Sequence, residues 1–378
     1  MFSVHQLSVR ARIVLTILIG ICSLPTANAQ TRTVQERPNI WNPQISTGIV
    51  FLGGYSTADE HDHEGAHGLE SGFQLQEIEL RVESNVDPFF RGIVSLAGHM
   101  HEGVMEVGFE EAFLSTIAIP DLTLRAGKFL LNFGKSNLRH THARHYLSAP
   151  MPTTALTGAD HLLGIGVSLD YLMPLPFYTE LNLQAVRPGW ETGHSEDSDG
   201  HAHGGGGDPL DLTYVTHLKT LFDLGDTTTL ELGGSYMANQ DDHGHLQSVW
   251  GVDMTMKWVP LQRARYETID WTTEYISSHR HGVQGDGLYT SIRRQTAQQW
   301  WMQLRGGVLG LTRETDTRRY RGETLLAFAP SERSAVRLQY ALETQAHSDT
   351  TADEHHDLVH EVFLQFIVSM GTHPAHAY

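Results

Sequence analysis

The sequence predicts an all-β fold, an antiparallel up-and-down β-barrel of about 16 strands. Three observations predict it: apolar and polar side chains alternate along successive segments, short turns alternate with long loops, and the number of alternating segments is even. Within residues 74–83, Ile78, Leu80 and Val82 share one face, and glutamate and arginine occupy the other. Because successive side chains of a strand point to opposite faces, this segment is predicted to be a strand with one apolar and one charged face.

The first eight strands follow from this alternation, bounded by turn residues such as Asn, Asp, Pro and Gly. They are predicted at residues 45–55, 74–83, 90–96, 105–115, 122–133, 162–172, 178–186 and 210–222. Short turns lie at residues 85–88, 119–121 and 174–176, and long loops follow the first, third, fifth and seventh strands. In the fourth strand Glu111 departs from the alternation, and the pattern gives no reason for it.

The other eight strands are predicted at residues 228–237, 249–258, 265–278, 288–294, 300–309, 322–328, 335–343 and 360–370. The second of these has the clearest pattern, because one face carries only large apolar side chains. They are Trp250, Val252, Met254, Met256 and Trp258. Short turns lie at residues 224–226, near 260, at 296–298 and at 330–333. Both termini of the chain then fall on the short-turn side of the barrel, as an even strand number requires.

The N-terminal residues have the pattern of a secretory signal peptide. Arg10 and Arg12 precede an apolar run at 13–24, and Ala27-Asn28-Ala29 forms a small-residue cleavage site. The apolar run is too short to span a membrane as a helix. The predicted organisation is a signal peptide at 1–29, a periplasmic N-terminal lead at 30–44 and a β-barrel at 45–378.

The charge balance favours cations as partners. The formal net charge is −18, and removal of residues 1–29, which contain Arg10, Arg12 and no acidic residue, makes it −20. Such a balance argues against nucleic acid and against an anionic membrane surface as partners. The single cysteine, Cys22, lies in the predicted signal peptide, so we expect no disulfide and no cysteine chemistry in the mature chain.

Two architectures fit many alternating strands. In a soluble periplasmic β protein the apolar faces point inward, and in a membrane barrel they point outward. A closed soluble barrel of about sixteen strands would enclose a space too wide for apolar side chains to fill. Trp250 and Trp258, at the two ends of one strand, fit an aromatic girdle. We therefore predict a transmembrane barrel in contact with outer-membrane lipid, with short periplasmic turns and long extracellular loops rich in His and Asp.

Four segments carry a family resemblance. Residues 72–83 (GFQLQEIELRVE), 87–91 (DPFFR), 124–134 (LRAGKFLLNFG) and 371–378 (GTHPAHAY) resemble histidine-rich, porin-like outer-membrane barrels of Gram-negative bacteria. That family is distantly similar to the phosphate-selective porins, and some relatives are labelled zinc-regulated outer-membrane receptors. The resemblance implies that the loop after the fifth strand folds into the pore. The chain departs from the phosphate-selective porins in its acidic charge, whereas their constrictions are basic.

Histidines in His-x-His pairs suggest metal binding. Residues i and i+2 of an extended chain point the same way, so each pair can offer two imidazoles to one ion. All six pairs fall at the long-loop end of the predicted barrel, near Asp and Glu. Imidazole with carboxylate suits Zn²⁺ or another divalent transition metal, bound weakly. The candidate ligands are His61, His63, His67, His99, His101, His140, His142, His145, His201, His203, His243, His245, His279, His281, His355 and His356.

Strand parity also predicts which polar residues line the pore. They are Glu77, Glu79, Arg81, Glu106, Glu110, Arg125, His217, Lys219, Asp253, Lys257, Asp270, Arg305 and Arg337. Acidic and basic residues that face each other across a pore create a transverse field, and the acidic excess favours cations.

The sequence thus predicts a cation-favouring outer-membrane channel whose His/carboxylate mouth concentrates divalent transition metals, with zinc as the expected ion. Binding has to be weak for ions to pass. The alternatives are a general porin with solvated histidines and a non-transporting metal-binding surface protein. We expect no enzyme, because the sequence has no nucleophile elbow, paired-carboxylate motif or HExxH. A homotrimer and a monomer both remain open.

Overall fold

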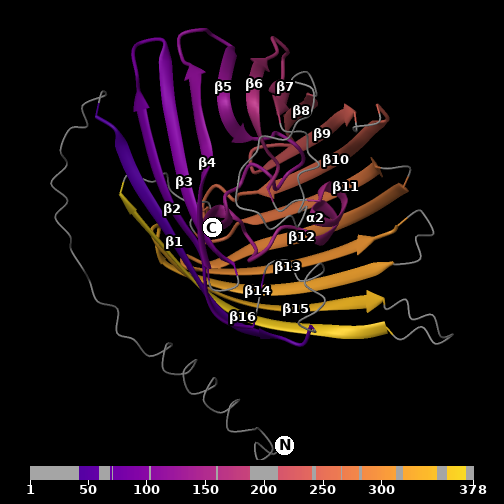
Figure 1. Cartoon of the computed structure of the whole chain (residues 1–378). Helices are drawn as coiled ribbons and strands as arrows, with labels where there is room; N and C mark the ends of the chain where they lie inside the picture. The colour runs from indigo at the N-terminus through magenta and orange to yellow at the C-terminus, as the bar shows by residue number, and fades with distance from the viewer. Residues whose placement is uncertain are drawn as a thin grey trace, which may run out of the picture. The chain divides into compact units, whose positions relative to one another are not determined.

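The computed structural model describes residues 42–58, 69, 71–101, 104–158, 161–187, 212–240, 244–264, 266–280, 283–311, 318–346 and 356–371. Within these ranges sixteen strands form one closed antiparallel barrel, in which β1 (Gln44–Ser56) pairs with β16 (His356–Gly371) (Figure 1). The predicted fold and strand number are therefore confirmed. The predicted signal peptide and nearly all of the lead lie outside the described residues.

Every predicted strand is present, with ends that differ by a few residues. The others are β2 (Gly72–Asn85), β3 (Phe90–His101), β4 (Val104–Thr116), β5 (Leu122–Leu130), β6 (Leu163–Leu172), β7 (Thr179–Arg187), β8 (Thr213–Asp223), β9 (Thr228–Gln240), β10 (Leu246–Trp258), β11 (Ile269–Arg280), β12 (Val283–Ala297), β13 (Trp300–Leu309), β14 (Arg319–Ser331) and β15 (Ser334–Ala346). No helix among the described residues has the length and hydropathy needed to cross a membrane.

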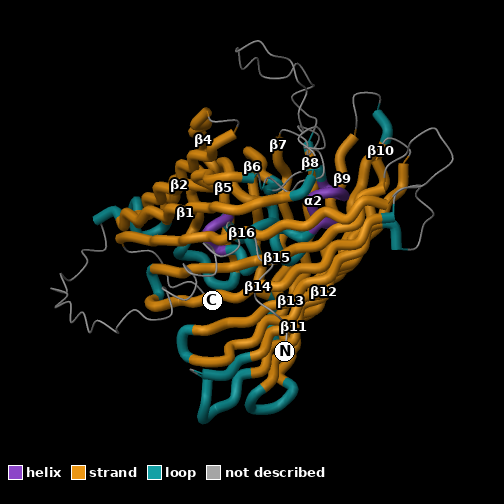
Figure 2. Tube along the Cα trace, turned by 90° about the horizontal axis from the view of Figure 1, so that it is seen from below, coloured by secondary structure: helices purple, strands orange, loops and turns teal. Residues whose placement is uncertain are grey.

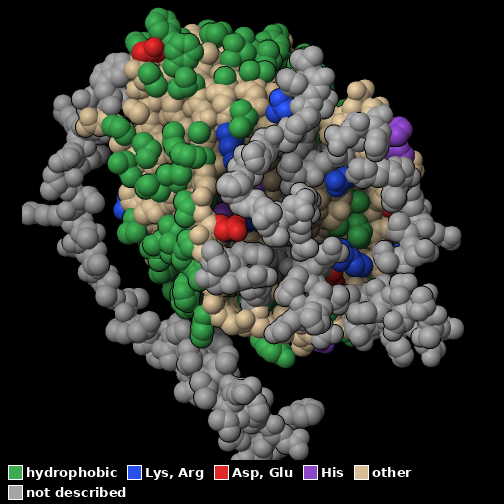
Figure 3. All heavy atoms as spheres, in the orientation of Figure 1, with side chains coloured by type: hydrophobic (Ala, Val, Ile, Leu, Met, Phe, Trp, Pro, Cys, Tyr) green, Lys and Arg blue, Asp and Glu red, His purple; other side chains and the backbone are tan. Residues whose placement is uncertain are grey.

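The two faces of the barrel differ as predicted. In β16, Glu361, Phe363, Gln365 and Ile367 are buried, and Val362 and Phe366 between them are exposed. Hydrophobic side chains cover much of the outer face visible at the left of the space-filling view, with few charged atoms among them (Figure 3). The exposed apolar face is thus the outer one, which is the arrangement of a membrane barrel.

A β-bulge explains the departure of Glu111 from the alternation. Ser95 of β3 pairs with Glu111, but the next residue, Leu96, pairs with Phe109, so Glu110 is an extra residue in β4. A bulge shifts the parity of the strand by one residue. Glu110 and Glu111 are consequently both buried inside the barrel, side by side in the sequence.

A segment of the chain crosses the barrel interior. Residues 131–162 connect β5 to β6 and contain the short helices η2 (Thr141–Ala143) and α2 (Met151–Thr157); their described part, 131–158 and 161–162, is here called the inserted segment. Figures 1 and 2 show α2 inside the ring of strands, and it contacts β11, β12 and β13. The loop after the fifth strand therefore lies in the interior, as the resemblance implied; helix α2 was not predicted.

Asn137 ties the two ends of the inserted segment together. Its amide Nδ2 donates to the carbonyl oxygens of Leu131 at 2.7 Å and Leu162 at 3.0 Å, and its Oδ1 accepts from the Leu162 backbone N–H at 2.7 Å. Nearby, Gly134 has a φ of +64°, and an added Cβ would lie 2.2 Å from Glu274 Oε1. The segment can therefore turn into the barrel here only with glycine.

Side chains of the barrel wall anchor the far part of the segment. Arg337 donates to the carbonyl oxygen of Arg144 at 2.7 Å, and Arg305 donates to that of Ser148 at 3.1 Å. Gln76 of β2 donates to the carbonyl oxygen of Leu147 at 3.0 Å. These anchors lie along one continuous part of the wall, which runs from β13 through β15, β16 and β1 to β2.

The interior is less polar than predicted. We expected charged faces lining water, but two apolar clusters lie inside the barrel and pack against the inserted segment. One consists of Phe129, Leu131, Phe133, Leu156, Leu162, Val186, Val215, Met237, Val249 and Ile276. The other consists of Leu52, Leu69, Tyr146, Leu147, Trp301, Leu325, Ala327 and Phe363. The inserted segment supplies the apolar partners that let these wall positions be apolar, which parity along a single strand cannot reveal.

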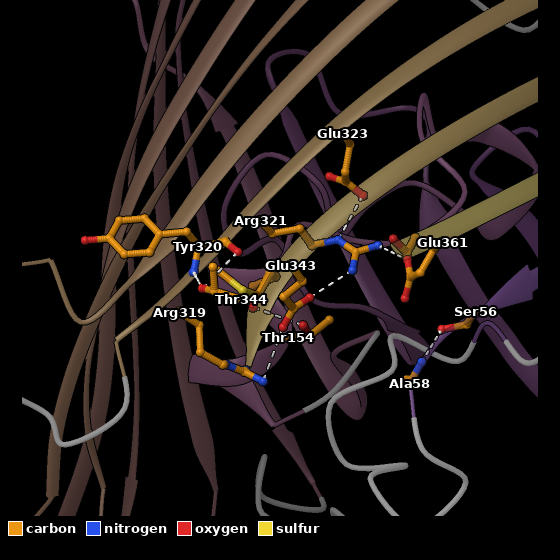
Figure 4. A network of polar contacts seen from close by, with 12 residues as sticks. Ser56, Ala58, Thr154, Arg319, Tyr320, Arg321, Glu323, Glu343, Thr344 and Glu361 are labelled. Atoms are coloured by element: carbon orange, nitrogen blue, oxygen red, sulfur yellow. Dashed lines mark hydrogen bonds and ion pairs between the residues drawn. The ribbon is translucent and has the colours of Figure 1, made fainter. Parts of the chain in front are cut away.

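A buried ion-pair network joins the last three strands. Arg321 of β14 contacts Glu323 at 3.2 Å, Glu343 of β15 at 2.8 Å and Glu361 of β16 at 2.5 Å (Figure 4). All four side chains are nearly inaccessible to solvent. In this part of the wall each carboxylate has a guanidinium partner.

Candidate metal centre between the inserted segment and the barrel wall

Four carboxylates form what is here called the carboxylate wall: Glu77 and Glu79 of β2 and Glu110 and Glu111 of β4. Positions 77 and 79 share the inward face of β2, and the bulge in β4 adds a second inward carboxylate there. The exposed fractions of the four residues are 0%, 1%, 6% and 7%. Carboxylates this deeply buried need charged or hydrogen-bonding partners, and the inserted segment supplies them.

His142 lies between two of these carboxylates. Its Nδ1 is 2.8 Å from Glu77 Oε1 and 3.0 Å from Glu79 Oε2. Gly48 of β1 leaves room for the ring, since a Cβ at this position would lie 3.4 Å from the imidazole. The hydroxyl of Ser95 also donates to Glu79. His142 is thus enclosed by the wall, with 2% of its surface exposed.

His140 lies between the other two carboxylates. Its Nδ1 is 2.8 Å from Glu110 Oε2, and its Nε2 is 3.3 Å from Glu111 Oε2. The rings of His140 and His142 are stacked, with centroids 5.8 Å apart. With both nitrogens of His140 next to carboxylate oxygens, the doubly protonated imidazolium satisfies both contacts.

The carboxylates change the acidity of both histidines. Burial by itself lowers the pKa of His142, but hydrogen bonds and charge from Glu77 and Glu79 outweigh it and raise the pKa to about 9. Burial is likewise outweighed at His140, where Glu110 and Glu111 hold the pKa well above the usual 6.5. Both imidazoles are therefore doubly protonated and positively charged at neutral pH, and a metal ion would have to displace a proton from each.

The donor set fits a divalent transition metal. Three groups, each with two carboxylates and one histidine, have ligand atoms within 4.8 Å of one another: Glu77–Glu79–His142, Glu79–Glu110–His140 and Glu77–Glu110–His99. In tetrahedral zinc sites, ligands about 2.1 Å from the ion lie about 3.4 Å apart, so only small adjustments of these atoms would be needed to hold an ion. One histidine with two carboxylates leaves a coordination position for water or a second histidine.

The structure does not bring the other described histidine candidates to these carboxylates. His145 Nδ1 lies 2.9 Å from an Arg139 nitrogen, and His245 and His279 are exposed. None of the three belongs to a metal-binding group among the described residues. His61, His63, His67, His201, His203, His243, His281 and His355 lie outside the described residues, and for His101 and His356 only the strand is described.

The predicted pore-lining residues lie at inward-facing positions of their strands. Those buried inside the barrel are Glu77, Glu79, Glu110, His217, Asp253, Arg305 and Arg337, those partly buried are Arg81, Arg125, Lys219 and Asp270, and Glu106 and Lys257 are exposed near strand ends. Most of the basic ones are paired, for example Arg125 with Asp170 at 3.1 Å. The contacts of Glu77, Glu79 and Glu110 include the histidines of the inserted segment, His140, His142 and His161.

Sequence reasoning missed two contributors to this site. His161 Nδ1 lies 3.9 Å from Glu110 Oε1, but it belongs to no His-x-His pair. Glu111 departs from the alternation of its strand, and that pattern alone predicts no role for it. An irregular carboxylate in an otherwise regular strand was the available signal, because bulges often redirect a side chain toward a functional site.

No family model matches the chain, and no curated protein matches its sequence. Among solved structures, it is similar to the outer membrane channel DcaP of Acinetobacter baumannii, with a TM-score of 0.55, 12% identity, and 87% of this chain and 96% of that chain covered. OprB of Pseudomonas putida has a TM-score of 0.54 and 8% identity, with 87% of this chain and 94% of that chain covered. The L8 loop-deletion mutant of OmpT, an outer membrane protein of Vibrio cholerae, has a TM-score of 0.54 and 9% identity, with 88% of this chain and 100% of that chain covered. At these identities the likeness shows the fold, which is that of outer-membrane porin barrels of Gram-negative bacteria.

Proposed function

We propose that this protein is a cation-favouring outer-membrane channel that binds a divalent transition metal, with zinc as the expected ion, at the carboxylate wall and the histidines of the inserted segment. The porin-type barrel supports a channel. The acidic excess of the chain supports cation preference, because fixed negative charge in a narrow lumen raises the local cation concentration.

One observation carries the proposal. His140 and His142 each lie against two buried carboxylates, at distances between 2.8 and 3.3 Å, between the inserted segment and the barrel wall. Of the four carboxylates, Glu111 also contacts Arg81 at 3.1 Å, and Glu110 lies 3.9 Å from His161. Four buried carboxylates gathered around imidazole nitrogens form a donor set that favours a divalent cation.

Proton competition would keep metal binding weak enough for transport. Since both histidines carry protons at neutral pH, an ion entering the site has to displace them, and this lowers its apparent affinity. Weak binding is what conduction requires, because a tightly bound ion does not leave. The same competition makes occupancy depend on pH.

A second candidate is a metal-binding barrel that does not conduct. The two apolar clusters that attach the inserted segment to the wall favour it, because they fill interior space that water would otherwise occupy. In that case the carboxylate wall would bind metal from one side of the barrel, and no ion would cross.

The test is single-channel recording of the refolded protein in a planar bilayer, with Zn²⁺ titrated at pH 7.5 and at pH 5.5. We expect cation-selective openings and a zinc-induced change in current at pH 7.5 that disappears at pH 5.5 and in Glu79→Gln. Glu180→Gln is the matched control, because Glu180 pairs with Lys219 at 3.4 Å and belongs to none of the metal-binding groups. Openings indifferent to zinc would leave a general porin, and zinc binding without openings would support the non-conducting barrel.

Oligomeric state is a separate part of the proposal. OmpT of Vibrio cholerae was solved in a trimer form, with a TM-score of 0.51 to this chain, and we propose a homotrimer here by analogy. Light scattering of the detergent-solubilised protein measures the protein mass of the complex. A mass close to the 42.2 kDa of one chain would exclude the trimer.

A further inference from the structure

A second polar region of the interior has the opposite charge. A cavity of about 50 Å³ lies between the inserted segment and the wall of β11 to β13. It is lined by Lys135, Ser136, Arg139, Arg144, His145, Tyr146, Ser148, Ala149, Pro150, Thr272, Tyr289, Ser291 and Arg305, and is here called the basic cavity. Four of these residues are lysine or arginine, and none is aspartate or glutamate.

Two of the four cations are neutralised from outside the cavity. Lys135 pairs with Glu231, and Arg305 pairs with Glu323. Arg139 differs from them. Its NH1 group lies 2.9 Å from His145 Nδ1, and among the described residues it forms no ion pair with a carboxylate. The basic cavity therefore has an excess of positive charge at Arg139.

The wall of the cavity also contains a buried hydroxyl without a hydrogen bond. Tyr146 is 5% exposed, and its OH has no partner among the described residues. The guanidinium of Arg305 lies over its ring, 4.2 Å from the centroid, and holds the ring in place. A buried hydroxyl normally finds a partner, because leaving it unpaired is unfavourable. This donor therefore points to a ligand that completes it.

We propose that the basic cavity binds a small oxyanion, with the Arg139 guanidinium and the Tyr146 hydroxyl as donors. A guanidinium presents parallel N–H groups that match the oxygens of a phosphate or a carboxylate. Size limits the ligand, since about 10–15 Å³ accommodates one water, so the cavity admits an ion of a few heavy atoms. The inference does not depend on metal binding at the carboxylate wall, which uses different residues.

The experiment is isothermal titration of the refolded, detergent-solubilised protein at pH 7.5, in a buffer free of phosphate and carboxylate. Inorganic phosphate and acetate are titrated separately, and sodium chloride is the reference for ionic strength. We expect saturable binding of at least one oxyanion, weakened about tenfold or more by Arg139→Gln, because a hydrogen bond to a charged group contributes about 1.5–3 kcal/mol. Arg125→Gln, which removes the same charge from a guanidinium outside the cavity, should change the affinity by less than about twofold.

Tyr146→Phe gives the second, independent readout. Because the hydroxyl has no partner in the ligand-free protein, its removal should leave the unfolding temperature unchanged or raise it, yet weaken oxyanion binding about threefold or more. Phosphate binding alone would identify a tetrahedral oxyanion and acetate binding alone a carboxylate; either supports the site. Absence of saturable binding of both anions would overturn the proposal. Equal losses in Arg139→Gln and Arg125→Gln would also overturn it, since they would reduce the effect to overall charge.

Discussion

The two sides of the inserted segment differ in how their charges are balanced. On one side His140 and His142 face four carboxylates of β2 and β4. On the other side Arg139 faces a cavity without any carboxylate in its lining. Residues 139 and 140 are adjacent in the sequence, so the surroundings of the chain change from mainly acidic to mainly basic within one residue.

This contrast teaches how one short segment can divide a barrel interior. Both sides are buried, so we expect the difference in charge to be poorly screened. Residues of the wall determine the sign of each side: carboxylates at 77, 79, 110 and 111 on one side, and Arg305, which pairs with Glu323, on the other. The transverse field stays a prediction, to which the inserted segment would contribute together with the strands.

The largest expected effect is on zinc affinity, and it tests whether the two sides of the inserted segment bind ligands independently. The double variant Glu77→Gln/Glu79→Gln should weaken Zn²⁺ binding by at least about 10- to 100-fold, a range typical even for residues that only support metal ligands. Arg139→Gln should leave zinc affinity within about twofold, because the Arg139 side chain lies on the opposite side of the segment. Isothermal titration with Zn²⁺ measures both. Similar losses in the two variants would mean that the sides act as one site.

A smaller effect on zinc affinity is expected from a change in pH. The pKa of His142 in the folded protein, about 9, lies above its usual 6.5, so its proton stabilises the metal-free protein below pH 6.5, and this contribution is lost as pH rises through 9. Zinc competes with that proton. Its apparent affinity should therefore rise about tenfold per pH unit between pH 7 and 8 for each proton displaced. Oxyanion binding in the basic cavity should not follow this dependence, and a zinc affinity independent of pH would contradict ligation by His142.

The smallest effect on zinc and oxyanion affinity should come from a variant that destabilises the whole inserted segment. Asn137→Ala removes three hydrogen bonds at the base of the inserted segment, where the residue is 4% exposed, and should cost about 2–3 kcal/mol of unfolding free energy. Zinc and oxyanion affinities should then both fall by only a few-fold, since neither set of ligands is touched. Denaturant unfolding and the two titrations measure this, with the exposed Asn42→Ala as control. A loss confined to one side would show that the sides are positioned independently.

Much of the fold could be predicted from the sequence because alternation is a local property. A strand such as 249–258 can be recognised from the alternation of its own residues. Sixteen such strands, joined by alternating short turns and long loops, predict a closed barrel. The inward position of Glu77 and Glu79 follows from the same parity. Within the candidate metal centre, the sequence therefore determined the wall of β2 and the presence of histidines in the segment that crosses the interior.

Only the tertiary structure decided which histidines meet which carboxylates. Glu111 turns inward because its pairing partner on β3 slips by one residue at the bulge, and such a slip depends on two strands at once. His140 and His142 reach the carboxylates and His145 does not, because hydrogen bonds from Asn137, Arg337 and Gln76 determine the path of the segment. Alternation within a strand is set by local geometry, but the path of an irregular segment depends on contacts between residues far apart in the sequence.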